Sequence, residues 1–298
     1  MNIIQKVTIL SAIGLSALVS SCESEEAESN NSTKEVKKDS VVVDRTEKIE
    51  NIFFNIPSPL ETVNILQKSG ATYEIELPLD PKLVDSYTDP IDQAVNMGIY
   101  SADLNYASVF GKTNDMYYFL ACSEKLGTEL GVGKVFSKEV TDRIEYNVED
   151  KDSMQIIISE LFWELDAALH EDGRESISAL IICGGWLEGI YLSSQLAVLN
   201  PANEDIKQRI AEQKYSIENL INLLKSYQLD SDLDDVIASF EDLAILFEQI
   251  TEEKVAGDNT IDEDGLPIIG QQIKLTMSDE LLREITQTIS AIRVEYTQ

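Results

Sequence analysis

The stretch that decides the fold is residues 175–199, ESISALIICGGWLEGIYLSSQLAVL, which is apolar almost all the way round a helical projection. From Ser176 to Asn203 the chain carries a single charged side chain, Glu188. A helix without a polar face is typical of a membrane span or of the centre of a helical bundle. Glu188, Gln195 and four serines disfavour a span, so we expect a central, fully packed helix.

Two details of this helix point to close neighbours. Gly184-Gly185 would let the backbone of another helix approach closely, because neither residue has a side chain. Glu188, Tyr191 and Gln195 follow i, i+3, i+7 spacing and form one polar stripe. Such a stripe needs polar partners, since an unpaired polar group is costly to bury.

Helix signals continue on both sides of this stretch. Ser58-Pro59-Leu60-Glu61 is a capping box with Pro at the first helical position, and Gly70 is a natural stop. Asp89-Pro90-Ile91-Asp92 opens another helix, which we expect to run to about Phe110, before Gly111. Further helices are predicted at 114–130 (ended by Gly131), 138–148, 153–171 (ended by Gly173), 203–227, 232–250 and 278–297.

The pattern as a whole predicts an all-α fold. Between residues 53 and 250 no run alternates with the period of a strand, and no fixed repeat length is visible. Short connections favour antiparallel neighbours. We therefore expect one helical domain over residues 51–298, built as an antiparallel helical bundle or a short array of helical hairpins.

Residues 251–277 interrupt the helical pattern and are expected to form a long acidic loop. The second half, Leu266 to Leu275, could make a short hairpin or an extended arm. Residues 258–265 resemble a calcium loop only weakly, because Thr260 and Gln271 stand where two acidic ligands belong. The only histidine, His170, has no partner for a zinc site and is expected on the surface. We expect neither a metal nor a cofactor.

Candidate site residues come from the helix at 89–110. Asn96 and Asp103 fall in the middle of its apolar face, where a lone carboxylate would be expensive to bury. Ser101, Asn105 and Ser108 are expected on the opposite, polar side. Asp103 must therefore be hydrogen-bonded, paired with a base, or exposed to a wet pocket.

One constellation combines the two helices, and its members are Asn96, Tyr100, Asp103, Trp186, Glu188 and Tyr191. Two carboxylates among aromatic rings could line a pocket for a sugar or a cation, or perform acid/base chemistry. They could equally form a buried polar network that sets the helix register. The position of Trp186 distinguishes the ligand site from the buried network. A ring exposed in a cleft favours a ligand site, and a buried ring favours a scaffold. No catalytic signature is present, so we expect a non-enzymatic protein.

The N-terminus carries a sorting signal. Lys6, the apolar run 7–19 and the small residues that follow predict a secretory signal peptide over residues 1–21. Val19-Ser20-Ser21-Cys22 resembles the lipobox of bacterial lipoproteins, which implies cleavage before Cys22 and acylation of that cysteine. The resemblance covers roughly the first 26 residues, and the rest of the chain resembles uncharacterised helical lipoproteins.

The residues after Cys22 predict a tether. Glu23-Ser24-Glu25-Glu26 resembles the acidic tag of surface-exported lipoproteins, and residues 22–50 have the composition of a disordered segment. In an oxidising envelope Cys122 and Cys183 could bridge, but both lie in apolar helical runs and we expect buried thiols.

The net charge and the composition of the chain restrict the classes of partner that it can bind. A formal net charge of -31 repels nucleic acid and anionic membrane surfaces, while 43% hydrophobic residues are enough for a globular core. We expect an outer membrane lipoprotein, facing the periplasm or the cell surface and held in the membrane by its N-terminal lipid. Its domain is expected to be a non-enzymatic scaffold or protein-binding domain with a partner in the envelope. The alternative is a small-ligand or glycan-binding surface lipoprotein.

Overall fold

Local sequence signals set the ends of the helices. The computed structural model describes residues 66–68, 70–228, 233–256, 260–261, 267–268 and 271–298, all within the unit Arg45–Gln298. The side chain of Asp89 caps the first turn of its helix by accepting the N–H of Ile91 at 2.9 Å. Gly131 and Gly173 take positive φ values of 78° and 67°, so both end their helices as predicted.

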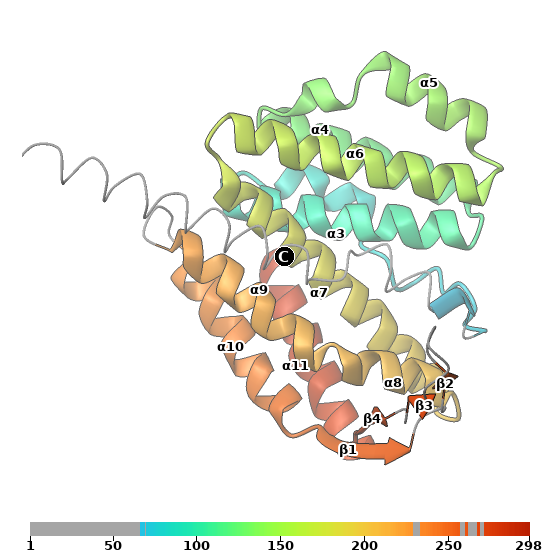
Figure 1. Cartoon of the computed structure of the whole chain (residues 1–298). Helices are drawn as coiled ribbons and strands as arrows, with labels where there is room; N and C mark the ends of the chain where they lie inside the picture. The colour runs from blue at the N-terminus through green and yellow to red at the C-terminus, as the bar shows by residue number, and fades with distance from the viewer. Residues whose placement is uncertain (1–65, 69, 229–232, 257–259, 262–266, 269–270) are drawn as a thin grey trace, which may run out of the picture. The chain divides into compact units, whose positions relative to one another are not determined.

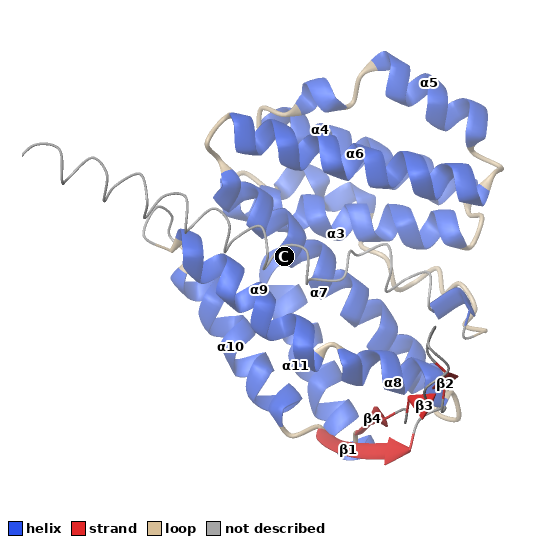
Figure 2. Ribbon diagram, in the orientation of Figure 1, coloured by secondary structure: helices blue, strands red, loops and turns tan. Residues whose placement is uncertain are grey.

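The described part of the chain is predominantly α-helical, and the predicted all-α fold class is confirmed for it (Figure 2). The helices are α3 (Pro90–Val109), α4 (Thr113–Glu129), α5 (Lys138–Asn147), α6 (Lys151–Glu171), α7 (Glu175–Leu199), α8 (Glu204–Glu212), α9 (Lys214–Tyr227), α10 (Asp234–Glu248) and α11 (Asp279–Thr297), with short 3-10 turns η1 (Pro81–Ser86) and η2 (Gly133–Val135). The predicted signal peptide, the tether and the capping box at Ser58 lie outside the described residues.

Two buried helices form the centre of the fold. Helix α7 passes between a group made of α3 to α6 and a group made of α8 to α11 (Figure 1). It is long and apolar enough to span a membrane by length and composition, but 78% of its most apolar window is buried inside the protein. The prediction of a central packed helix at 175–199 is therefore confirmed.

Helices α3 and α7 cross with their backbones in contact. A Cβ atom built on Gly98 would lie 2.0 Å from the carbonyl oxygen of Ile181, and one on Gly184 would lie 1.9 Å from that of Val95. No side chain fits between the two helices at this point. The close approach predicted for the Gly184-Gly185 pair is confirmed, and its partner is α3.

Helix α3 is buried on every side, which the sequence pattern did not predict. Ser101, Asn105 and Ser108, expected on a polar outer face, are 3%, 0% and 1% exposed. The reason is that α4, α6, α7 and α11 all pack against α3, so no face is left for solvent. The hydroxyl of Ser101, for example, lies 3.4 Å from that of Ser123 on α4.

The predicted helix at 203–227 is in fact two helices, α8 and α9. They meet at Gln213, whose backbone (φ -69°, ψ -9°) caps α8 and precedes α9. Gln213 is buried, and its side-chain oxygen accepts a hydrogen bond from the indole N–H of Trp186. This tertiary contact favours a break that local helix propensity does not indicate.

The predicted acidic loop contains a β-hairpin. Strand β1 (Thr251–Ala256) pairs antiparallel with β4 (Gln271–Thr276), with Thr251 opposite Thr276 and Ala256 opposite Gln271. Inside it, β2 (Thr260–Ile261) pairs with β3 (Pro267–Ile268). The charged run at the start of β1 hides the strand from a periodicity search, because exposed strands on a hairpin need no apolar face.

We expect Gly98→Ala to destabilise the domain by about 3 kcal/mol, because the added methyl group must push two backbones apart. An alanine in an ordinary helix would instead be stabilising relative to glycine. Urea unfolding of the purified protein measures the difference. Gly173→Ala is the control, since only its positive φ is unfavourable there, at a cost of about 1 kcal/mol. An unchanged stability of Gly98→Ala would contradict the close crossing.

Candidate functional site

The two predicted carboxylates lie together inside the helical core. Asp103 on α3 and Glu188 on α7 are both 0% exposed. Arg293 on α11 pairs with Glu188 in a two-pronged ion pair, Nε to Oε2 at 2.5 Å and Nη2 to Oε1 at 2.9 Å. This geometry is the strongest that an arginine and a carboxylate can make. The ion pair therefore joins α7 to α11, and Asp103 on α3 interacts electrostatically with both partners.

Aromatic and backbone groups enclose the ion pair. The guanidinium of Arg293 lies 4.1 Å from the ring centroid of Tyr191, which packs over it as a cation–π partner. Nη2 of Arg293 also donates to the carbonyl oxygen of Leu77 at 3.3 Å. Burial alone lowers the pKa of Arg293, but Glu188 raises it by more, so the guanidinium stays charged.

The carboxyl group of Asp103 has a shifted pKa. Burial raises the pKa of the Asp103 carboxyl well above its ordinary range, and the negative charge of Glu188 raises it further. Arg293 and the N–H of Leu79, which donates to Oδ2 at 2.9 Å, act in the opposite direction without offsetting burial. Among the described residues, Oδ1 of Asp103 has no hydrogen-bond partner. The protonated form of Asp103 is therefore favoured beside the Glu188–Arg293 ion pair.

Asn96 and Tyr100 serve other contacts along α3. The amide of Asn96 donates to the carbonyl oxygens of Asp92 at 2.9 Å and Tyr296 at 2.6 Å, which fastens the last turn of α11. The hydroxyl of Tyr100 donates to the carbonyl oxygen of Asp80 at 3.0 Å. Neither side chain takes part in the carboxylate pair.

Trp186 lies in a different part of the core. Its ring is 2% exposed and packs beside Phe240 and Phe247, with centroids 5.9 Å and 6.2 Å away. The indole N–H donates to Gln213 at 3.1 Å. The structure thus groups Asp103, Glu188 and Tyr191 and separates Trp186 from them. A buried Trp186 is the arrangement that favours a scaffold over a ligand site.

Arg293 is the cluster member that sequence reasoning missed. It occupies a position on α11 where the spacing of Ile285, Ile289 and Tyr296 predicts an apolar residue facing the core. A single arginine within an apolar stripe is a readable signal, because a buried cation requires an acidic partner. Glu188, the one charged residue between Ser176 and Asn203, was the matching signal.

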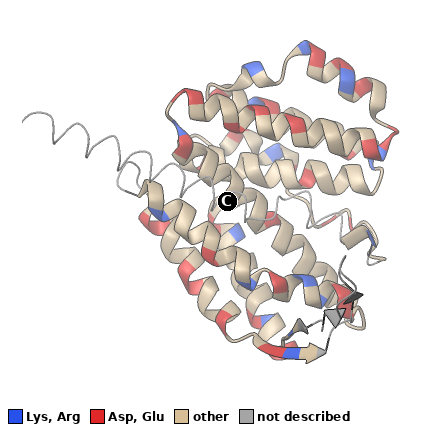
Figure 3. Ribbon diagram, viewed as in Figure 1, with Lys and Arg blue, Asp and Glu red and all other residues tan. Residues whose placement is uncertain are grey.

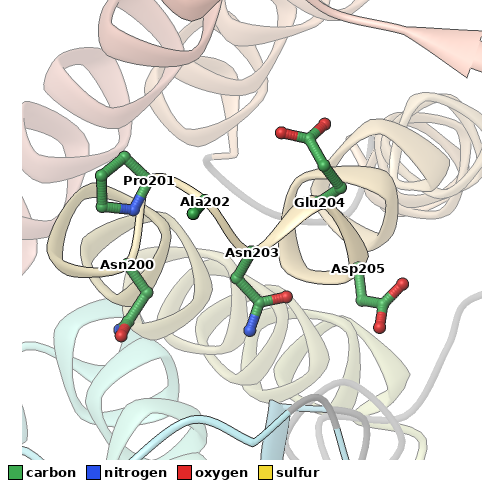
Figure 4. Close-up of a pocket in the computed structure, with 6 residues that line it drawn as sticks. All are labelled: Asn200, Pro201, Ala202, Asn203, Glu204 and Asp205. Carbon is green, nitrogen blue, oxygen red and sulfur yellow. The ribbon is translucent and has the colours of Figure 1, made fainter.

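A surface depression of about 540 Å³ lies at the turn between α7 and α8 (Figure 4). Its polar side chains serve the helix ends: Asn200 donates to Leu196 at 3.0 Å, and Asn203 accepts the N–H of Ile206 at 3.3 Å. The residues around it are Asn200, Pro201, Ala202, Asn203, Glu204 and Asp205. These groups cap helices and converge on no common point.

The histidine and the cysteines lie apart from the carboxylate pair. His170 is exposed and lies 3.4 Å from Glu175. Cys122 and Cys183 are both free and buried, as predicted, and burial raises the pKa of the Cys122 thiol to about 12. Among the described residues, no three His, Cys, Asp or Glu side chains are grouped to hold a metal ion. Cys22 lies outside the described residues.

No protein-family model, curated protein or solved structure matches this chain.

We expect Arg293→Met to destabilise the domain by about 3–5 kcal/mol, because Glu188 would keep a buried negative charge without its cation. Urea unfolding near neutral pH measures the loss. The control is the double variant Arg293→Met with Glu188→Leu, which removes both charges and should recover most of the stability. A double variant as unstable as the single one would show that packing, not charge, makes Arg293 important.

We expect Asp103→Asn to change how stability depends on pH. An aspartate in the unfolded chain titrates near pH 3.9, whereas the folded pKa of Asp103 is raised. The folded protein therefore holds the proton more tightly, and stability falls as the pH rises above about 4 until the folded pKa is passed. Asparagine cannot ionise, so the variant should be more stable than the natural protein at about pH 8 and no more stable at about pH 4. Thermal unfolding at both pH values checks this, and equal losses at both would contradict it.

Proposed function

We propose that this chain is a lipid-anchored envelope protein whose helical domain binds another protein. The lipobox-like ending at Cys22 supports attachment to the outer membrane, on the periplasmic side or the cell surface. The internal use of Asp103, Glu188 and Trp186 supports a scaffold, because these side chains serve helix packing.

The observation that carries the binding role is an exposed apolar face on α6. Trp163 is 61% exposed and Ile156 is 57% exposed, about two helical turns apart on the same face. Tyr146, near the end of the neighbouring helix α5, is 90% exposed. We call Ile156 and Trp163 the α6 patch. Tryptophan and tyrosine are enriched at the centres of protein interfaces, where their large rings displace water.

Charge around the α6 patch indicates the kind of partner. Acidic residues predominate over basic ones along the ribbon (Figure 3). Asp152, Glu160 and Glu164 on α6 are exposed beside the patch, and Arg143 on α5 neutralises only Glu160, at 2.7 Å. A partner with an apolar pocket rimmed by lysine or arginine would match this surface.

We expect the double variant Ile156→Ala with Trp163→Ala to lose its envelope partner. Truncating side chains at the centre of an interface weakens binding by about 2 kcal/mol or more, which is roughly thirtyfold in affinity. The measurement is cross-linking of the tagged full-length protein in cells, followed by identification of the captured protein. Ile245→Ala on α10 is the matched control, since Ile245 is 58% exposed but lies on another helix.

Fractionation of the same cells tests the lipid anchor separately from partner binding. Cys22→Ser should release the chain from the membrane fraction while leaving the α6 patch intact. Undiminished capture of the same partner by the Ile156 and Trp163 double variant would contradict the role of the patch. Membrane attachment of Cys22→Ser would contradict the lipid anchor.

A further inference from the structure

The α6 patch belongs to a longer apolar line on the exposed face of α6. Ala167 is also exposed, and it falls on the same side of the helix as Ile156 and Trp163. At 100° per residue, the three side chains lie within about 40° of one another around the helix axis. Each residue advances an α-helix by about 1.5 Å, so the line from Ile156 to Ala167 is about 16 Å long. The exposed apolar surface is therefore a straight stripe about three turns in length.

An acidic row runs beside this apolar line. Glu160, Glu164 and Glu171 are exposed and lie on one side of the line, about 40° to 80° around the helix from Ile156. That side lies next to α5, because Arg143 of α5 donates to Glu160 at 2.7 Å (Figure 1). Over its whole length α6 has five acidic residues and one lysine. An occupant of the apolar line is therefore matched by positive charge along one side of its own apolar surface.

The backbone of α6 indicates which kind of element can lie on this face. Its N–H and C=O groups between Ile156 and Ala167 are used within the helix itself. An extended peptide placed here would bury its own backbone groups without partners, which is costly. A second helix satisfies its backbone internally, so it can exclude water from this face without that loss. A straight stripe also suits the class of helix packing in which the two axes cross at about 20°.

We infer that the partner covers the α6 patch with an amphipathic, basic helix that lies nearly along α6. Its apolar stripe packs against Ile156, Trp163 and Ala167, and lysine or arginine residues on one side of that stripe lie beside Glu164 and Glu171. The pocket that receives the Trp163 ring is then the space between apolar side chains of the partner helix. This inference rests on the proposed function, because it names the kind of element that binds the patch.

A second row of exposed residues provides a way to measure the occupant. Asp152, Ser159 and His170 lie on the side of the apolar line opposite to the acidic row, within about 20° of one another. They are seven and eleven residues apart, which corresponds to about 10 Å and about 16 Å along α6. In the experiment, the photo-cross-linking residue p-benzoylphenylalanine replaces each of the three singly in the tagged full-length protein in cells. Mass spectrometry then locates the captured residue in the partner.

We expect all three positions to capture the same protein, at points about seven and eleven residues apart in its sequence. A helix alongside α6 has the same rise per residue, so it reproduces the spacing of the probes. An extended segment rises about 3.3 Å per residue and would be captured at points about three and five residues apart. The control places the same photo-cross-linking residue at Ile245 on α10, which is exposed on another helix and should not capture this protein.

The outcomes separate this inference from the proposed function. Capture at points about three and five residues apart, or on segments distant in the sequence of the partner, overturns the helix and leaves the α6 patch as an interface. Capture from none of the three positions overturns the proposed function as well.

The acidic row is tested with the double variant Glu164→Gln and Glu171→Gln. Removing two charges beside the apolar line should reduce capture through Ser159 about fivefold, because charges at the rim of an interface attract a partner of opposite sign. The matched control is Glu248→Gln with Glu284→Gln, which removes two exposed charges from α10 and α11. Equal capture by the two double variants would show that only net charge matters, and it would overturn the basic side of the partner helix.

Discussion

The direct contact between the backbones of α3 and α7 is the constraint on which the other features depend. At Gly98 and Gly184 the two helices approach until carbonyl oxygens occupy the space of a side chain. Two long helices this close bury each other along one face, and the remaining helices cover what is left (Figure 1). Polar residues on both helices are then placed inside the protein, where they must find partners or be neutralised.

The buried polar groups explain how the helices are held in one arrangement. Apolar packing tolerates small slips of one helix along another, whereas a two-pronged ion pair between Glu188 and Arg293 does not. The amide of Asn96 fastens the end of α11 to α3 in the same way. A buried ion pair contributes little net stability, so we expect its role to be the selection of one helix register. We regard the polar interior as a device for specificity.

Much of the helical framework follows from local sequence. The polar cluster of Asp103, Glu188 and Arg293 follows instead from contacts between distant parts of the chain. Asp89-Pro90, Gly131 and Gly173 mark helix ends because capping and positive φ are properties of single residues. Residues 175–199 predict burial because their composition leaves no polar face. Three other features depend on which helices become neighbours. They are the pairing of Arg293 with Glu188, the break at Gln213 and the burial of Ser101. An arm or hairpin at 266–275 was expected, but its partner strand β1 was hidden because that strand is charged and exposed.

The polar cluster also bears on the order in which the chain folds. Arg293 reaches Glu188 across 105 positions and Leu77 across 216, and Asn96 reaches Tyr296 across 200. Contacts at such separations form late, because closing a long loop costs entropy before any contact rewards it. We therefore expect Glu188 to stay hydrated until α11 docks. Docking of α11 is then the step that excludes water from the core and fixes the final arrangement of the helices.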